Sequence, residues 1–261
     1  MKLLRLLAVH CLFFLFPIAG QCGLSDSITI MTYNVHNCKG LDEKIDYSRV
    51  ASVISKFKPD FVALQELDSA AVRSAQKVVL NELAAHTQMI PTYRASIKFQ
   101  GGKYGIGMLT REKPVSVESI SLPGREEVRS LLVVETSKYM VCCTHFSLTA
   151  ADRLASVAII DSITAKYNKP VFLAGDFNMS PNSREMKALL CNWELLSNAQ
   201  EPTFPADQPN ECIDFIFRRK DTKAAVTVQK AEVVKEPIAS DNLPDAETHL
   251  CKSELSHFPQ A

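Results

Sequence analysis

The feature that most constrains this chain is a polar residue that recurs at the end of short apolar segments typical of β-strands. A buried charge is costly unless it is paired or binds a metal. One such residue often only caps a strand, but several together predict a shared polar site. The segments end at or just before Asn34, Glu66, His145 and Asp176, and Asp214 lies inside a further apolar run.

The spacing of apolar residues predicts both helices and strands. A period near 3.6 residues indicates helices, and short apolar or β-branched runs between turn residues indicate strands. We expect helices over 47–57, 75–86, 149–166 and 182–190. We expect strands over 28–35, 61–65, 97–99, 106–110, 115–121, 130–136, 139–145, 171–174, 213–217 and 225–234. This order favours an α+β fold in which two mixed sheets pack together with helices outside.

Composition and length are those of one globular domain. The chain has 261 residues, of which 46% are hydrophobic and 22% charged, and its formal net charge is zero. These values exclude a disordered or fibrous chain, and nothing in the charge balance indicates a nucleic-acid groove. No linker or repeat divides the sequence, so we expect a single domain over 24–261 that is a monomer.

The first twenty residues differ from the rest. Two basic residues precede an apolar run over 6–16 and a small-residue exit, which is the pattern of a secretory signal. We therefore predict a signal peptide over 1–20 and a periplasmic or secreted protein; the alternative is a buried N-terminal helix. The run is too short for a stable membrane span. Cys22 would permit a lipid anchor, although Gln21 before it is unfavourable.

Export would place the cysteines in an oxidising compartment. Cys191 and Cys212 bracket a loop-rich stretch. We predict a disulfide between them, and buried free thiols are the alternative.

The candidate residues are mostly oxygen donors, which suit a hard divalent cation such as Mg²⁺, or Mn²⁺. Magnesium binds one or two carboxylates together with a substrate phosphate, as phosphoryl chemistry requires. A zinc site would need clustered His or Cys, and a serine hydrolase of the Gly-x-Ser-x-Gly type would need that motif; the sequence offers neither.

Eight short motifs in order give the chain a family resemblance over residues 28–244. They are Met31-Thr-Tyr-Asn-Val-His-Asn37, Val62-Ala-Leu-Gln-Glu66, Tyr104-Gly-Ile-Gly-Met-Leu-Thr110, Thr144-His-Phe146, Leu173-Ala-Gly-Asp-Phe-Asn178, Thr203-Phe-Pro205, Ile213-Asp214 and Ser240-Asp-Asn-Leu-Pro244. In this order the chain resembles the endonuclease/exonuclease/phosphatase superfamily, metal-dependent phosphoesterases of the exonuclease III and DNase I type. The resemblance implies a four-layer α/β/β/α sandwich.

The resemblance also implies roles for individual residues. Metal ligands would be Glu66, Asn34 and Asp241. Asp176 would orient or deprotonate the attacking water, and Asn178 and His145 would contact the phosphate. Weaker candidates for substrate contacts are Arg153, Tyr104 and His36. The implied activity is hydrolysis of a phosphodiester or phosphomonoester in a nucleic acid, a nucleotide, a phospholipid headgroup or a sugar phosphate.

The chain departs from the family pattern in two places. Asp214 would normally hold a histidine in a Ser-Asp-His segment, but Asn242 stands there, and asparagine cannot carry a proton or a positive charge. A catalytically impaired binding protein is therefore the alternative function. The segment 245–257 is polar and not strand-like, where an apolar closing strand is expected, which would fit an altered C-terminus. His249 or His257 would be the substitutes for the missing histidine.

Overall fold

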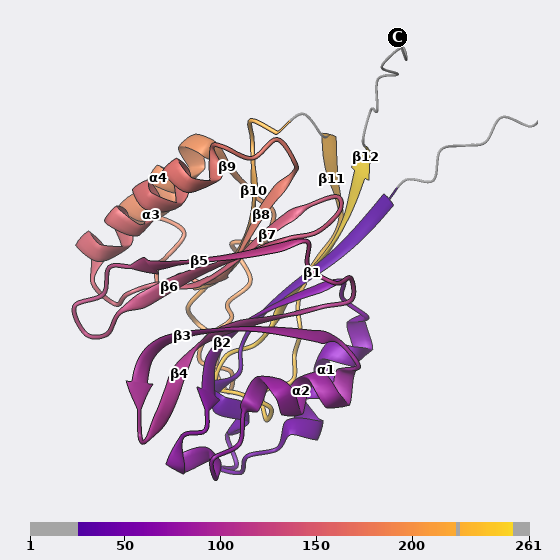
Figure 1. Ribbon diagram of the computed structural model, residues 1–261. Coiled ribbons are helices and arrows are strands. Elements are labelled where there is room, and N and C mark those ends of the chain that lie inside the picture. Colours follow the sequence, from indigo (N-terminus) through magenta and orange to yellow (C-terminus); the bar gives the residue numbers. More distant parts are fainter. Residues whose placement is uncertain (1–25, 223–224, 253–261) are drawn as a thin grey trace, which may run out of the picture.

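A computed structural model describes residues 26–222 and 225–252 of the chain, which form two mixed sheets of six strands each (Figure 1). The predicted signal peptide over 1–20 and Cys22 lie outside the described residues. The first sheet has the spatial order β11 (Ala225–Val233), β12 (Asp245–Lys252), β1 (Asp26–Asn34), β2 (Phe61–Ser69), β4 (Gly102–Thr110) and β3 (Ile90–Phe99). The second has the order β5 (Ser116–Leu122), β6 (Arg129–Glu135), β7 (Met140–His145), β8 (Val171–Asp176), β10 (Asp214–Arg219) and β9 (Trp193–Leu195).

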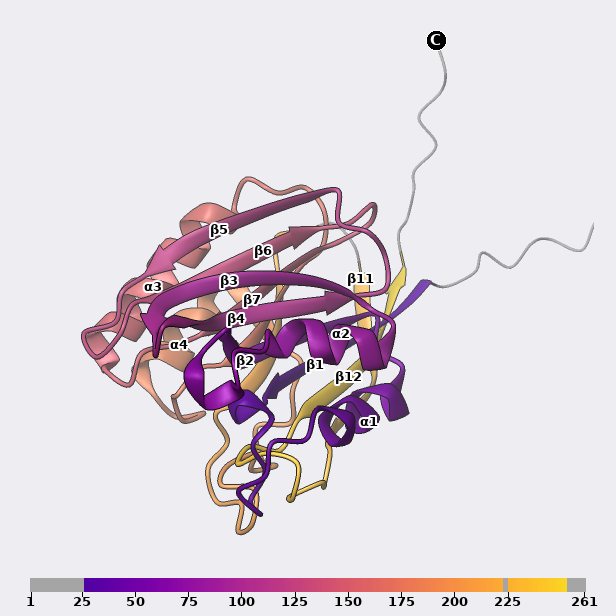
Figure 2. The same ribbon diagram turned by 60° about the horizontal axis from the view of Figure 1, so that its bottom comes forward.

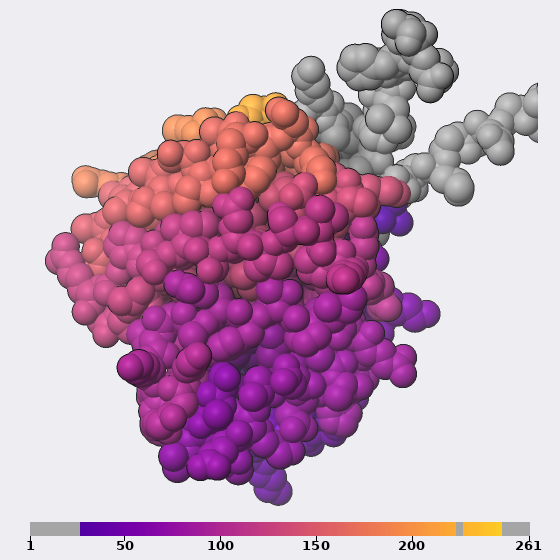
Figure 3. Space-filling model, in the orientation of Figure 1, coloured from indigo at the N-terminus to yellow at the C-terminus, as the bar shows by residue number. Residues whose placement is uncertain are grey.

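Helices cover the outer face of each sheet. α1 (Tyr47–Phe57) and α2 (Val79–Thr87) pack on the first sheet, and α3 (Ala150–Thr164) and α4 (Arg184–Asn192) pack on the second (Figure 1). Two 3₁₀ turns, His36–Cys38 and Val72–Ser74, complete the helical elements of the described residues. The predicted α/β/β/α sandwich is confirmed, and Figure 3 shows the early and late parts of the chain stacked one above the other.

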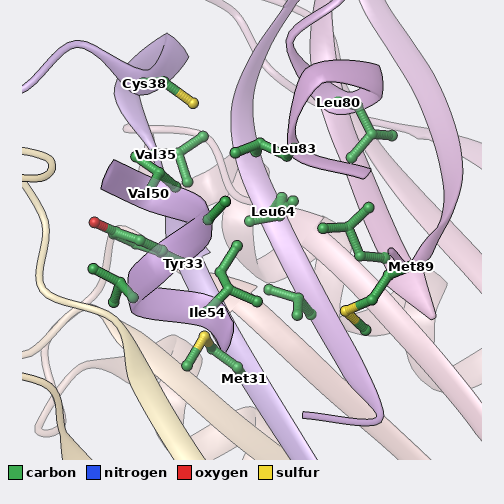
Figure 4. Packing of buried hydrophobic residues seen from close by; sticks show 14 of the residues in the cluster. Met31, Tyr33, Val35, Cys38, Val50, Ile54, Leu64, Leu80, Leu83 and Met89 are labelled. Carbon is green, nitrogen blue, oxygen red and sulfur yellow. The ribbon is translucent and has the colours of Figure 1, made fainter. Parts of the chain in front are cut away.

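Three hydrophobic clusters separate the four layers. The first lies between the first sheet and its helices and includes Ile54 and Leu64 (Figure 4). The second lies under α3 and α4, and the third fills the space between the sheets. Cys142 belongs to the second cluster and its neighbour Cys143 to the third, as alternation along a strand requires.

Helix α1 shows how local sequence sets an element's limits. The Asp46 side chain caps its first turn by accepting a hydrogen bond from the Arg49 N–H at 2.9 Å. Val50 and Ile54 lie one turn apart and are fully buried. Pro59 follows the helix, which ends as predicted at Phe57.

Two parallel strand pairs bring distant residues to one end of the sandwich. β1 runs parallel to β2, and β7 runs parallel to β8. Their carboxyl ends carry the polar residues noted in the sequence. The loop before β12 lies against the end of β1 in both ribbon views, and the Ser240 hydroxyl donates a hydrogen bond to the Asn34 carbonyl oxygen at 2.8 Å (Figure 1 and Figure 2).

The prediction that residues 245–257 are not strand-like is wrong for the first eight of them. Asp245–Lys252 forms β12, which pairs antiparallel with both β1 and β11. Backbone pairing on both sides therefore outweighs the polar sequence, which is a common tertiary override of strand propensity. His249 pairs with Ile28, about 13 Å along the strand from the register of Asp245 with Thr32. It is thus not placed as a substitute for the missing histidine, and His257 lies outside the described residues.

The predicted disulfide is also wrong, because Cys191 and Cys212 are both free thiols. Cys212 precedes β10 near Asp214, whereas Cys191 precedes Trp193, which pairs with Arg219 at the other end of β10. The length of β10 separates the two positions by roughly 17 Å. A disulfide needs Cα atoms within about 7 Å.

Among the described residues, no helix is both long and apolar enough to cross a lipid bilayer.

The hydrophobic cluster between α1 and the first sheet should contribute strongly to the free energy of unfolding. We expect Ile54→Ala to lower the free energy of unfolding by about 2–5 kcal/mol, because it leaves a cavity in a fully buried site. Ile238 is 57% exposed, so Ile238→Ala is a matched control that should stay within about 0.5 kcal/mol of wild type. Urea denaturation measures both changes, and equal losses would contradict the proposed packing.

Candidate active site

The side-chain amide of Asn34 joins the two sheets. Its Nδ2 donates to Glu66 Oε1 at 3.1 Å within the first sheet and to Asp176 Oδ2 at 3.1 Å in the second. Its Oδ1 accepts a hydrogen bond from the His36 N–H at 3.2 Å. Asn34 therefore holds two carboxylates from different sheets beside one another.

Glu66 reaches this position through a β-bulge. The pairing of β2 with β4 shifts between Leu64 and Leu67, so β2 carries one extra residue there. Glu66 has a φ of 60°, in the left-handed region that residues with a Cβ rarely adopt. Such strain is typical of functional sites. Leu64 and Leu67 thereby stay in the core while Glu66 turns into the cleft.

The segment Gly175-Asp176-Phe177-Asn178 is built for one geometry. A Cβ on Gly175 would lie 2.2 Å from the Thr144 carbonyl oxygen, so only glycine allows β7 and β8 to approach this closely. Phe177 is fully buried and anchors the turn. Asn178 has a φ of 48°, which asparagine tolerates, and its backbone N–H donates to Asp176 Oδ1 at 2.9 Å.

Asp214 lies beneath the cleft, paired in register with Asp176. Its Oδ2 accepts a hydrogen bond from Asn242 Nδ2 at 3.0 Å. The Thr203 hydroxyl oxygen accepts the Asp214 N–H at 3.4 Å and so fixes the start of β10. Asn242 thus occupies the place that the family resemblance assigns to a histidine.

The three carboxylates resist ionisation in this environment. Burial raises the pKa of Asp176 to about 6, against the opposing effect of the Asn34 hydrogen bond and with help from the charge of Glu66. Burial also raises the pKa of Glu66. The pKa of Asp214 lies well above its usual range because of burial and the charge of Asp176. The site therefore has more buried carboxylates than its own cations neutralise.

This excess of carboxylates fits a hard divalent cation. Glu66, Asn34 and Asp241 all line the cleft, and each has a side-chain oxygen that could coordinate a cation. Among the described residues, no three His, Cys, Asp or Glu side chains converge into a metal cage. The donor set therefore suits an ion that binds one or two carboxylates and keeps its remaining positions for water and phosphate, as Mg²⁺ does.

His145 and Arg129 both lie near enough to Asp176 to affect it. His145 Nε2 lies 3.7 Å from Asp176 Oδ2. Burial and the nearby Arg129 charge lower the pKa of His145 well below its ordinary value, so His145 acts as a neutral hydrogen-bonding group. Arg129 is itself buried and pairs with Glu127 at 2.9 Å and with Glu126 at 3.5 Å.

Most of the predicted site residues line one cleft of about 580 Å³. Asp214 is buried behind Asn242, and His36 touches the cleft through Asp241, since its Nδ1 lies 3.3 Å from Asp241 Oδ2. The predicted residues that line the cleft directly are Asn34, Glu66, Tyr104, His145, Asp176, Asn178, Asp241 and Asn242.

Arg153 was predicted as a weak candidate for substrate contact, but it does not line this cleft. Its guanidinium pairs with the buried Glu185 at 2.7 Å and donates to the carbonyl oxygens of Ser147 and Leu148 at 3.1 and 2.8 Å. The guanidinium is occupied by joining α3 to α4 and to the loop after β7.

The wall of the cleft also holds acidic and cationic residues that the sequence patterns did not indicate. Arg129 follows the charged turn Arg125-Glu-Glu-Val128 and opens β6, which pairs antiparallel with β7. The start of an antiparallel strand lies beside the end of its neighbour, so pairing β6 with the His145 strand would have placed Arg129 in the site. Phe204 and Ile213 belong to motifs quoted above but were given no role, and the other lining residues that the sequence did not indicate are Glu126, Glu127, Leu148 and Glu211.

Comparison with known proteins shows the family to which the chain belongs and the solved structures that share its fold. The model of the Endonuclease/Exonuclease/phosphatase family matches residues 31–241. The endonuclease/exonuclease/phosphatase structure from Bacteroides vulgatus is 18% identical, with a TM-score of 0.71, covering 87% of this chain and 100% of that one. A mannosyl-6-phosphatase from Bacteroides thetaiotaomicron is 15% identical, with a TM-score of 0.68 and coverage of 85% and 99%. The human Nocturnin catalytic domain is 17% identical, with a TM-score of 0.63 and coverage of 87% and 94%.

At these identities the likeness to the solved structures shows the fold alone. Among curated proteins, no sequence matches this chain.

The raised pKa of Asp176 predicts a pH-dependent stability without metal. Between 3.8 and about 6 the folded protein keeps a proton on Asp176 that the unfolded chain has lost, so stability falls as the pH rises through this window. Asp176→Asn should flatten this fall and raise stability at pH 7 by on the order of 1–3 kcal/mol. Urea denaturation in EDTA measures it, with the exposed Glu118→Gln as control; a variant less stable than wild type at pH 7 would contradict it.

Proposed function

Because the chain belongs to the endonuclease/exonuclease/phosphatase family, whose members are phosphoesterase hydrolases that generally depend on a divalent metal, we propose that it is an exported, magnesium-dependent phosphoesterase. It hydrolyses a phosphodiester or phosphomonoester by direct attack of water. The observation that carries the proposal is the buried Asp176 carboxylate beside Glu66, with a pKa of about 6.

Asp176 is suited to act as the general base. A base works best when its pKa lies near the working pH, and 6 is closer to neutrality than the usual value for aspartate. Asn34 and the Asn178 backbone N–H each bond one carboxylate oxygen, so the orientation of the group is set before a water binds. Asp176 accepts the proton of the attacking water.

Three side chains then hold the phosphate. Asn178 Nδ2 donates one N–H to the Phe146 carbonyl oxygen at 3.0 Å and keeps a second for a phosphate oxygen. Neutral His145 lies beside it at the cleft floor, and Asn242 offers its remaining N–H. A Mg²⁺ ion held at Glu66, Asn34 and Asp241 would neutralise charge that develops on the phosphate.

Asn242 limits what this site can do. It can position the phosphate and bond Asp214, but it cannot protonate a leaving group near neutral pH. The chemistry therefore depends more on charge neutralisation and less on proton donation than it would with a histidine at this position. Esters with acidic leaving groups should be the easier substrates.

The export part of the proposal is supported by the signal-like pattern of residues 1–20. N-terminal sequencing of the protein recovered outside the host cytoplasm tests it. We also propose a monomer, since most large apolar side chains of the described residues are buried, largely in three internal clusters. Sedimentation analysis tests that state.

A second candidate function is favoured by Asn242 itself. In this alternative the chain is a binding protein that holds a phosphate ester without turnover, because the histidine has been lost. The two functions share a ligand class and differ only in catalysis.

Removal of the proposed base should abolish turnover. We expect Asp176→Ala to lower kcat on bis(p-nitrophenyl) phosphate by about 10²–10⁴ in the presence of Mg²⁺, because no other group takes the water proton. Excess EDTA should reduce the wild-type rate as strongly. Exposed Glu118→Ala serves as the control and should keep the wild-type rate. Equal rates for wild type and Asp176→Ala would refute the proposed enzyme.

Restoring the histidine separates the enzyme from the binding protein. We expect Asn242→His to raise kcat on an alkyl phosphate, a poor leaving group, by about 10²-fold or more, and on an aryl phosphate by far less. Asn242→Gln keeps the carboxamide and is the matched control. Activity that appears only in Asn242→His would make the natural chain a binding protein, whereas no gain with either ester would show that proton donation is not what the site lacks.

A further inference from the structure

A second, smaller hollow lies beside the active-site cleft. Its volume is about 180 Å³, and its walls are Arg73, Ile97, Phe99, Tyr104 and Glu127. Tyr104 and Glu127 also line the cleft, so the two spaces share a wall. We call this space the side lobe. It is smaller than the roughly 300 Å³ at which pockets for drug-sized ligands begin, and therefore matches a single ring.

Arg73 makes one wall of the side lobe rigid. Its Nε and one terminal nitrogen donate to the two oxygens of Asp68 at 2.8 and 2.9 Å, and Asp68 is fully buried. The guanidinium lies 4.5 Å from the ring centroid of Phe99 and 5.6 Å from that of Tyr104. It already occupies the aromatic faces that a cationic ligand would use, and its charge repels such a ligand.

The charges around the side lobe are balanced. Asp68 neutralises Arg73, and Glu127 pairs with Arg129 at 2.9 Å. What remains are guanidinium N–H donors, carboxylate acceptors and the Tyr104 hydroxyl, set beside the apolar surface of Phe99. A ring that carries hydroxyl groups both donates and accepts hydrogen bonds and presents C–H edges to apolar walls, so it suits this lining.

The cleft next to the side lobe is unfavourable for a polyanion. Glu126, Glu127 and Glu211 line it, and Arg129 is its one Lys or Arg among the described lining residues. Arg129 is already paired with two of these glutamates. A nucleic acid strand is bound largely by cations that neutralise successive phosphates, and this wall would repel the phosphates beside the scissile one.

We propose that the side lobe binds the uncharged, hydroxyl-bearing ring of the substrate, so that the chain acts on a small sugar phosphate. This inference rests on the proposed phosphoesterase function. It selects one substrate class from the phosphate esters that such a site accepts.

A substrate panel on the full chain with Mg²⁺ tests the inference. It compares a hexose 6-phosphate with ethyl phosphate, a nucleoside 5′-monophosphate, phosphocholine and a DNA oligonucleotide. We expect kcat/KM for the hexose phosphate to exceed each of the others at least tenfold. Preference for the nucleotide, phosphocholine or the oligonucleotide would overturn the inference and leave the phosphoesterase intact.

If no ester is hydrolysed, the proposed phosphoesterase activity is refuted, and the inference about the side lobe is then tested by measuring ligand affinity. Calorimetric titration should then show the hexose phosphate binding at least tenfold more tightly than inorganic phosphate. Equal affinities would overturn it.

Filling the side lobe provides the structural test. Ile97→Trp should lower the ratio of kcat/KM for the hexose phosphate to that for ethyl phosphate at least tenfold, mainly through KM. Lys98 is the exposed next residue of β3 and lies outside the side lobe, so Lys98→Trp should leave this ratio unchanged. Phe99→Ala is the second variant in case Ile97→Trp does not fold, and it should lower the same ratio. An unchanged ratio in a folded lobe variant would overturn the inference.

Discussion

The hydrogen bonds of one carboxamide, that of Asn34, join the two halves of the active site. Its Nδ2 bonds Glu66 from the first sheet and Asp176 from the second, so it spans the interface at the open end of the sandwich. Two carboxylates held this close repel one another when ionised, and burial adds to that cost. The bulge at Glu66, the glycine at 175 and the left-handed Asn178 are local departures from regular structure that keep this arrangement in place.

The cost of that arrangement explains the chemistry that the site supports. Burial, helped by the charge of Glu66, raises the pKa of Asp176 towards neutrality, and the excess of carboxylates would favour binding of a divalent cation. Burial and the charge of Arg129 lower the pKa of His145, which leaves it a neutral donor. With Asn242 beside Asp214, the proposed reaction would leave proton donation to water or to the substrate itself. In the proposed reaction the site would therefore assist water activation more than leaving-group departure.

The charges of this cleft also differ from those expected of a cleft that binds a nucleic acid strand. Arg129 is paired with glutamates. The charges around the side lobe beside Tyr104 are balanced, so the side lobe suits a neutral ring better than a phosphate or a cation. The aromatic faces of the side lobe are taken by Arg73, which is locked by buried Asp68. The residues of the cleft walls, more than those of its floor, therefore determine the proposed substrate preference.

Apolar periodicity and strand-end polar residues were enough to predict the layers and most of the residues that line the cleft. Helix α1 spans the predicted residues 47–57 and is followed by Pro59, and the strand-end residues Asn34 and Asp176 do meet, through a hydrogen bond between the two sheets. Other features follow from contacts between distant segments. Asp245–Lys252 is a strand because two neighbours pair with its backbone, Arg153 is committed to Glu185, and Cys191 lies a strand length from Cys212. Each of these outcomes depends on contacts between segments far apart in the chain, which local periodicity and composition do not encode.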